Sequence, residues 1–199
     1  CVLLGFLVMG GGLGARPLYA KECFVTSNLV LGYPEIKTKD YQWIQSIRKK
    51  YDDYYYNVVE PHFTIVFPVF DYSFELLREH IFRISQNTHT IKFNLKSTSI
   101  VKDSFSDCTN VFLVPDIGNS EIIRLHDKLY TDILRKELRL DIAFIPHIAI
   151  GGSHNAEEAK DISDEINKVN FEIVGEIRNL SLIEYDHPKV ELLEKFNLQ

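Results

Sequence analysis

A chain of 199 residues has the size of one compact domain, and its 45% hydrophobic and 25% charged residues are enough to enclose an apolar core. The formal net charge is −6, and the sequence contains no long basic run. Tight binding of a long nucleic acid is therefore not expected, because it needs clustered lysine and arginine to displace counterions. A small anionic substrate is compatible with this charge.

The three cysteines, Cys1, Cys23 and Cys108, form no C-x-x-C pair and have no histidines at zinc-ligand spacing. They indicate a reducing, cytoplasmic setting, and we expect a monomer that does not associate with membranes. The apolar run from Cys1 to Met9 is too short to span a bilayer, which needs about 20 apolar residues. We interpret residues 1–23 as an N-terminal extension outside the fold.

The glycines after this run imitate a nucleotide-binding turn. Gly10-x-Gly12-x-x-Ala15 resembles the dinucleotide-binding fingerprint. Arg16-Pro17 would open a poor helix, however, and no βαβ unit follows. The favoured interpretation is a flexible glycine linker, so that no nucleotide cofactor is expected.

Apolar periodicity predicts an alternation of strands and helices in the first half of the chain. Tyr41, Ile44 and Ile47 recur at helical spacing, and Ser73 is a suitable N-cap for a second helix. The basic run Arg48-Lys49-Lys50 is interpreted as a solvated helix end. The expected strands are 24–31, 58–66, 91–95 and 111–114, and the expected helices are 39–51 and 74–84.

The second half repeats this order of elements. Apolar residues from Ile122 to Ile133 recur at helical spacing and predict one long helix. Asn155 with Glu158 resembles a capping box at the start of a further helix. The expected elements are helices at 122–133 and 155–169 and strands at 142–150, 171–185 and 189–196.

Two short segments carry one pattern at equivalent places in this repeat. They are Pro61-His62-Phe63-Thr64-Ile65 and Pro146-His147-Ile148-Ala149-Ile150. Because side chains alternate along a strand, His62 and Thr64 are predicted to face the same side. The repeat predicts a single domain over 24–199 with lobes over about 24–115 and 116–199 that can exchange terminal strands. Equivalent residues would then line one shared cleft.

The two motifs resemble the paired H-x-[ST]-x motifs of the 2H phosphoesterase superfamily, in particular the 2′-5′ RNA ligase-like group of LigT proteins and cyclic phosphodiesterases. The resemblance covers about residues 24–197, and Ala149 departs from the motif pattern. It implies an α+β fold of two pseudo-symmetric lobes, each an antiparallel sheet with helices on its outer face, around a central cleft. It also implies hydrolysis of 2′,3′-cyclic nucleotides, RNA cyclic-phosphate ends or 2′-5′ linkages.

Paired histidines suit this chemistry because imidazole titrates near neutrality, so that one ring can accept a proton while the other donates one. His62 and His147 are therefore the expected catalytic pair. Which ring is the acid and which the base stays open, and no metal or other cofactor is required. Thr64 is expected to donate its hydroxyl to a phosphate oxygen as negative charge develops.

Ala149 weakens the second motif, because its methyl group cannot donate a hydrogen bond. Loss of one such donor costs roughly 10²–10³-fold in rate. Ser153 is a candidate replacement donor, and Phe67, just after the first motif, is a candidate contact for a nucleobase. Two alternatives to a hydrolase stay open: a nucleotide- or RNA-end-binding protein with little turnover, and an RNA ligation or RNA-end processing protein.

The remaining histidines are expected to be structural. A lone histidine more often fills a half-buried position and bonds to the backbone than serves as a ligand. No H-x-H or H-E-x-x-H spacing occurs, so no metal site is expected. These histidines are His80, His89, His126, His154 and His187.

Overall fold

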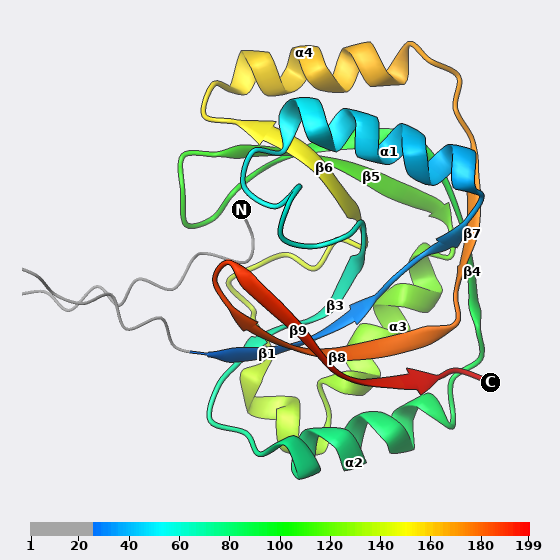
Figure 1. Ribbon diagram of the computed structural model, residues 1–199, viewed down its shortest axis with the longest axis vertical. Coiled ribbons are helices and arrows are strands. Elements are labelled where there is room, and N and C mark those ends of the chain that lie inside the picture. Colours follow the sequence, from blue (N-terminus) through cyan, green and yellow to red (C-terminus); the bar gives the residue numbers. More distant parts are fainter. Residues whose placement is uncertain (1–25) are drawn as a thin grey trace, which may run out of the picture.

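The chain folds into two antiparallel sheets with helices packed on their outer sides (Figure 1). The structure, a computed structural model, describes residues 26–199. Its α+β architecture of two lobes around a central cleft confirms the predicted fold class. The strands are β1 (Ser27–Gly32), β2 (Glu35–Ile36), β3 (Phe63–Val69), β4 (Ile91–Lys102), β5 (Thr109–Ile117), β6 (Ile148–Ser153), β7 (Ile173–Ile177), β8 (Asn179–Asp186) and β9 (Lys189–Asn197). The helices are α1 (Thr38–Tyr51), α2 (Phe74–Ser85), α3 (Asn119–Leu129), the 3₁₀ segment η1 (Asp132–Glu137) and α4 (Ala156–Asn167).

Both sheets combine strands from the two halves of the chain. One has the order β3-β1-β8-β9 and the other the order β2-β7-β4-β5-β6. Helix α2 covers the first sheet, α1 and α4 cover the second, and α3 packs against β3 and reaches β4 and β5 (Figure 1). The expected division into 24–115 and 116–199 therefore does not separate the sheets, because β4 and β5 pair with strands of the second half.

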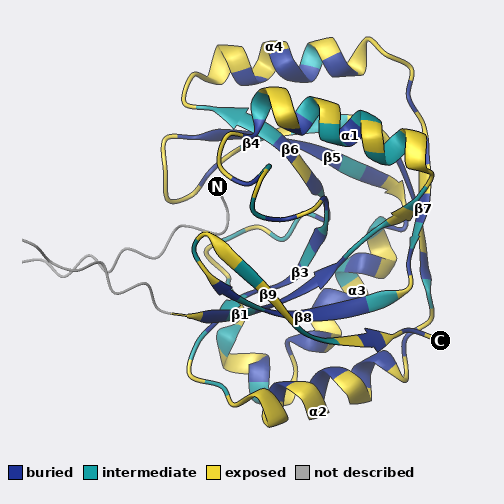
Figure 2. Ribbon diagram, viewed as in Figure 1, coloured by how far each residue is buried: buried dark blue, intermediate teal, exposed yellow. Residues whose placement is uncertain are grey.

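Buried apolar side chains form one core that joins both sheets to the inner faces of the helices (Figure 2). Phe63 of β3 and Phe93 of β4 meet edge to face with ring centroids 5.1 Å apart, which links the sheets directly. A second, smaller cluster packs the segment after α1 against the opposite face of β1 and β8. Its members are Leu29, Leu31, Tyr55, Val59, Ile183 and Tyr185.

The predicted helix starts are confirmed at two caps. The Ser73 hydroxyl accepts a hydrogen bond from the Leu76 amide at 3.4 Å, and the Asn155 side chain accepts one from the Glu157 amide at 2.9 Å. Each cap satisfies an amide that has no partner inside its helix, and so fixes where the helix begins.

Several predicted elements have different bounds in the structure. The helix expected over 122–133 ends at Leu129, and the chain continues through Asp132, at φ 48°, into the 3₁₀ segment η1. The strand expected over 142–150 begins at Ile148, and the strand expected over 58–66 begins at Phe63. In both cases the apolar residues ahead of the strand are connections that are partly buried, which periodicity does not distinguish from strands.

The run expected as one strand over 171–185 is two strands in different sheets. Strand β7 pairs with β4, whereas β8 pairs with β1, and the chain crosses between the sheets at Arg178. A continuous apolar run gives no sign of such a crossing, because both strands are buried on their core faces.

No helix within residues 26–199 is long and apolar enough to cross a bilayer. The extension expected over 1–23, with its apolar run and glycine-rich stretch, lies outside the described residues. Cys108 is buried and carries a free thiol.

Candidate active site

His62 and His147 line one pocket between the two sheets. His62 directly precedes β3, and His147 directly precedes β6. These two strands lie at an edge of their respective sheets. Thr64 and Ala149, each two residues after a histidine, line the same pocket. The structure therefore brings the predicted pair together and places both motif positions on one side, as alternation predicted.

Both imidazole rings are anchored in the same way. Nδ1 of His62 lies 2.7 Å from the Glu60 carbonyl oxygen, and Nδ1 of His147 lies 2.6 Å from the Ile145 carbonyl oxygen. A carbonyl oxygen only accepts hydrogen bonds, so Nδ1 carries the hydrogen in each ring. The lone pair of each neutral ring is therefore on Nε2, the atom available for proton transfer.

Aromatic side chains restrict the orientation of both rings. Phe112 stacks on His147 with ring centroids 3.6 Å apart and an angle of 16°. Tyr33 meets His62 edge to face, with centroids 6.1 Å apart and an angle of 64°. Phe112 stands opposite Ala149 in the β5–β6 ladder, so this stack belongs to the regular strand pairing. The two Nε2 atoms are thus held on rigid elements.

Burial lowers the pKa of His62 to about 4 and that of His147 also to about 4. The Glu60 and Ile145 carbonyls oppose this shift. The nearby Arg48 charge lowers the pKa of His62 further, and His62 lowers the pKa of His147. Both rings are consequently neutral at pH 7, and a proton on one ring disfavours a proton on the other.

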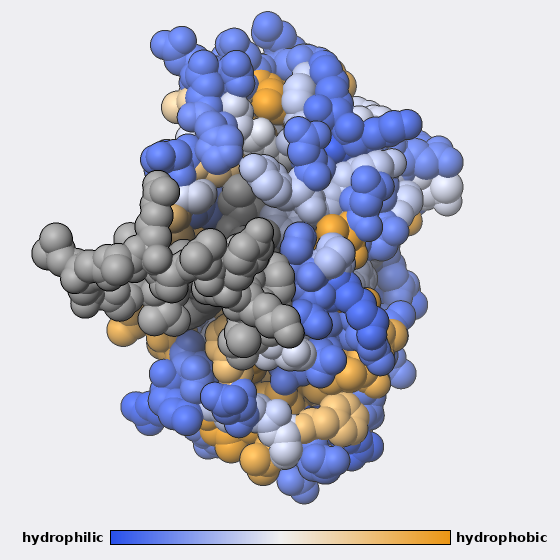
Figure 3. Space-filling model, turned by 60° about the vertical axis from the view of Figure 1, so that its left-hand side comes forward, coloured by the Kyte–Doolittle hydropathy of each residue, from blue (hydrophilic) through white to orange (hydrophobic). Residues whose placement is uncertain are grey.

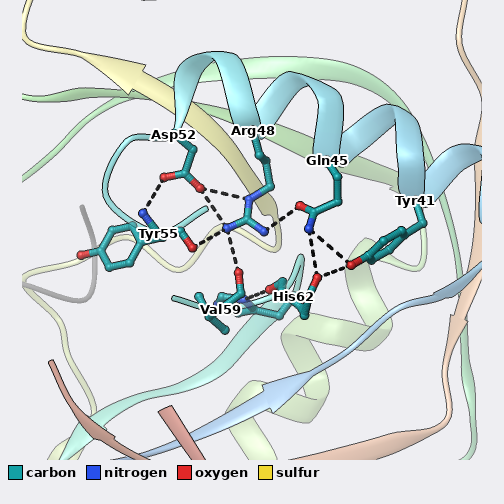
Figure 4. Close-up of polar contacts among 8 residues, drawn as sticks. Tyr41, Gln45, Arg48, Asp52, Tyr55, Val59 and His62 are labelled. Atoms are coloured by element: carbon teal, nitrogen blue, oxygen red, sulfur yellow. Dashed lines mark hydrogen bonds and ion pairs between the residues drawn. The ribbon is translucent and has the colours of Figure 1, made fainter. Parts of the chain in front are cut away.

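Arg48, on α1, connects this helix to the segment that carries His62 (Figure 4). Its side chain is only 2% exposed. Nε donates to Asp52 at 3.0 Å, and Nη2 donates to the backbone carbonyls of Tyr55 at 3.0 Å and Val59 at 2.8 Å. The expected solvated helix end is therefore wrong for Arg48, because these acceptors lie beyond the helix.

Glu60 completes the connection between α1 and the first histidine. Its carboxylate is contacted by the Tyr41 hydroxyl and by Nε2 of Gln45 at 3.0 Å, both from α1 (Figure 4). Its backbone carbonyl holds His62 Nδ1. Tyr41, Gln45 and Arg48 share one helix face at spacings of four and three, a polar stripe that sequence reasoning missed beside the apolar one.

Two side chains hold the outer edge of β3, one from α3 and one from the residue that directly follows this helix. His126 Nδ1 lies 2.8 Å from the Ile65 carbonyl, and the Tyr130 hydroxyl accepts from the Phe67 amide at 3.0 Å. The His126 ring also stacks on Phe144, with centroids 3.6 Å apart. These contacts join the strand after His62 to the segment before His147, in agreement with a structural role for His126.

The two candidate substrate contacts, Phe67 and Ser153, lie in different parts of the structure. Phe67 lines the histidine pocket. Ser153 lies outside this pocket and lines a neighbouring groove, where its hydroxyl donates to Glu158 at 2.6 Å and accepts from the Asn155 amide at 3.0 Å at the start of α4. Ser153 therefore does not stand in for the donor that Ala149 lacks. Its two bonds are local, and the capping pattern of Asn155 and Glu158 was the signal for them.

The pocket thus presents two Nε2 atoms, one threonine hydroxyl and aromatic walls. Within residues 26–199 no group of three or more histidine, cysteine or acidic side chains is arranged to hold a metal ion. Paired imidazoles of this kind can remove a proton on one side of a phosphodiester and deliver one on the other.

The sequence model of the 2′-5′ RNA ligase superfamily matches residues 36–189, a span that includes both histidine motifs. The chain belongs to this superfamily. A Bacillus licheniformis protein is 28% identical over 133 residues, which cover 65% of this chain and 73% of that protein. A Staphylococcus saprophyticus protein is 27% identical over 175 residues, which cover 85% and 99%. Both relatives bear the name "Putative phosphoesterase". These names support phosphoesterase activity for members of the superfamily to which this chain belongs.

Two solved structures share the two-sheet fold of this chain. Escherichia coli LigT, complexed with 3′-AMP, has a TM-score of 0.50 at 14% identity, and the match covers 87% of this chain and 98% of LigT. Kluyveromyces marxianus Usb1 has a TM-score of 0.50 at 9% identity, with 86% and 98% covered. The resemblance to the 2H phosphoesterases is therefore confirmed at the level of family and fold.

Proposed function

We propose that this protein is a metal-independent phosphodiesterase that acts on 2′,3′-cyclic nucleotides, RNA cyclic-phosphate ends or 2′-5′ linkages. The observation that carries the proposal is the pair of histidines, each anchored through Nδ1, in one pocket with Thr64. Escherichia coli LigT was crystallised in complex with 3′-AMP, which supports a nucleotide-sized substrate here.

In the proposed reaction, the neutral ring accepts a proton from water through Nε2 while the water oxygen bonds to phosphorus. The bond from phosphorus to the leaving ribose oxygen breaks, and the protonated ring delivers its proton to that oxygen. The Thr64 hydroxyl donates to a non-bridging oxygen as charge builds on the phosphoryl group. The products are a phosphomonoester and a free hydroxyl from a cyclic substrate.

The test is a panel of 2′,3′-cyclic nucleotides and 2′-5′-linked dinucleotides incubated with the purified protein and excess EDTA, with products separated by chromatography. Turnover that a variant lacking both histidines does not show would support the proposal, and the product would identify the leaving oxygen. Turnover that EDTA abolishes, or that the double variant retains, would reject the two-histidine mechanism.

A binding protein with little turnover is the second candidate, and Ala149 favours it. This residue lines the histidine pocket without a polar side chain, and Ser153 does not replace the missing donor. This function predicts that a 2′,3′-cyclic nucleotide binds in calorimetry but remains intact after prolonged incubation. Multiple turnovers per protein molecule would eliminate it.

The pKa values of the histidines predict a bell-shaped pH profile with an acidic optimum. The free protein has both values near 4, and catalysis requires one ring protonated and one neutral. We expect kcat/KM to rise as the pH falls from about 8 to about 5, and to fall again once both rings are protonated. A profile that is highest near pH 8 would contradict this assignment.

The same shifts predict a loss of stability in acid. Histidine takes up a proton near its ordinary pKa of 6.5 in the unfolded chain, but only near 4 in the folded one. Between these values the unfolded chain binds more protons, so the free energy of unfolding decreases as the pH falls from about 6.5 to about 4. Urea titrations across this range should show a smaller decrease for the variant with glutamine at both positions.

A further inference from the structure

A large groove opens from the histidine pocket on the side of α4. Its volume is about 870 Å³, and it runs between the end of α1 and the β6–α4 connection. Asp52, Tyr55 and Ala149 line both the groove and the histidine pocket, so the two spaces are continuous at these residues. A phosphodiester bound between the histidines would therefore have room for a substituent on this side.

Carboxylates dominate the charged residues of this groove. Five acidic side chains line it, against one lysine, Lys50. Glu165 is paired with Lys50 at 3.4 Å, and Asp52 is paired with Arg48. Asp53 and Asp161 form no ion pair within residues 26–199, so their charges face the groove without compensation. The five acids are Asp52, Asp53, Glu158, Asp161 and Glu165.

A smaller space beside the histidine pocket has fewer charged residues in its lining than the groove has. A second cavity of about 160 Å³ shares Phe67, Phe112 and His147 with the histidine pocket. Lys102 and Asp103 bring opposite charges to its lining, and much of the rest is apolar. The space-filling view shows many hydrophilic residues over the layer of α1 and α4 (Figure 3). Of these two spaces, only the groove has an excess of acidic over basic residues in its lining.

Ala149 forms the passage between the histidine pocket and the groove. Ala149 is exposed. Its side chain is smaller than that of Thr64, the pseudo-equivalent residue of the first motif, which is branched. A single methyl group at this position leaves the passage wider than the threonine of the first motif would. Asp52 and Tyr55 line the same junction, from the segment that follows α1.

We propose that the groove receives the leaving alcohol of the phosphodiester, and that this alcohol is rich in hydroxyl or amino donors and carries no phosphate of its own. The inference rests on the proposed function and names its substrate class. Ionised carboxylates only accept hydrogen bonds, so they favour donor-rich groups. Their uncompensated charge repels a second phosphate. A nucleoside joined by a single 2′-5′ phosphodiester meets both conditions, whereas a longer oligonucleotide does not.

The test compares two substrates that differ by one phosphate. One is a 2′-5′-linked dinucleoside monophosphate, and the other is the same molecule with a 3′-phosphate on the leaving nucleoside. We expect kcat/KM to be about tenfold lower for the phosphorylated substrate, from like-charge repulsion across the groove. The Asp53→Asn, Asp161→Asn double variant should reduce this ratio to about threefold or less. Glu75→Gln, Glu79→Gln, on α2, is the control with the same change in net charge, and it should leave the ratio unchanged.

The outcomes separate this inference from the proposed function. Equal kcat/KM for both dinucleotides, or a preference for the phosphorylated one, would overturn the inference while hydrolysis itself still stood. If neither dinucleotide nor a cyclic nucleotide is hydrolysed, the proposed function fails, and calorimetric dissociation constants for the two dinucleotides decide the inference instead. Weaker binding of the phosphorylated one supports it, and equal, reversed or undetectable binding rejects it.

A second variant tests the passage at Ala149. Ala149→Thr adds a hydroxyl and narrows the opening, so the rate for a 2′,3′-cyclic mononucleotide and the rate for the dinucleotide should respond differently. We expect the ratio of kcat/KM for the dinucleotide to that for the cyclic mononucleotide to fall by about fivefold to tenfold. An unchanged or increased ratio would show that the leaving group does not pass this residue.

Discussion

His62→Gln and His147→Gln are each expected to lower kcat/KM for a 2′,3′-cyclic nucleotide by about 10²–10⁴-fold, the range typical for loss of a general acid or base. Glutamine is close to histidine in size and keeps an amide that can bond to the neighbouring carbonyl, but it cannot exchange a proton near neutral pH. The rate of product formation, measured by chromatography at several substrate concentrations, gives kcat and kcat/KM for each variant.

Two controls make the result specific. His89→Gln removes an exposed histidine in the connection between α2 and β4 and should leave the rate within about twofold, as expected for a surface substitution. The double variant should be no more than slightly slower than either single variant, because the two rings act as one unit. Near wild-type rates in either single variant, with unchanged thermal melting, would refute the catalytic pair.

Arg48→Met is expected to destabilise the protein by about 3–5 kcal/mol, the cost typical of breaking a buried ion pair. The side chain is 2% exposed and its partner Asp52 is 9% exposed, so the carboxylate would remain buried without its counter-charge. The carbonyls of Tyr55 and Val59 would also lose a donor. Urea unfolding followed by circular dichroism measures the change. Lys49→Met, an exposed neighbour on the same helix, is the matched control.

A double variant separates charge from packing. Arg48→Met combined with Asp52→Asn removes both charges, so it should recover part of the lost stability. Arg48→Met should also lower kcat, because Val59 and Glu60 are next to each other in the chain and the Glu60 carbonyl anchors His62. A loss of stability below about 1 kcal/mol would show that the buried network contributes no more than a surface pair.

Local sequence features predicted the parts of the fold that depend on a few neighbouring residues. The helix caps at Ser73 and Asn155 are set by side chains that bond two or three residues away. The shared face of His62 and Thr64 follows from strand alternation alone. The helix expected over 122–133 was too long, because apolar spacing continues through the turn at Asp132 into η1.

The two histidine motifs of the candidate site were predictable from the sequence, but the residues that surround them in the structure were not. Phe67 lines the histidine pocket from within β3, where it is buried, and Ser153 lines the neighbouring groove, where its hydroxyl bonds to the start of α4. A substrate contact for either residue stays a prediction. Arg48 looked like an ordinary basic residue at a helix end, because its acceptors at Tyr55 and Val59 are backbone carbonyls, which no sequence pattern displays. The acidic groove combines residues from α1, β6 and α4, three elements that meet only in the fold.

By itself the sequence determined the two histidine motifs, the family they indicate and most helices, because these depend on residue identity and on spacings of a few residues. Only the tertiary structure decided that β4 and β5 pair with β6 and β7, that Arg48 is buried, and that both histidines have a pKa near 4. Strand pairing and desolvation depend on which distant segments pack together, and the free energy of that packing is shared by the whole core rather than by any one segment.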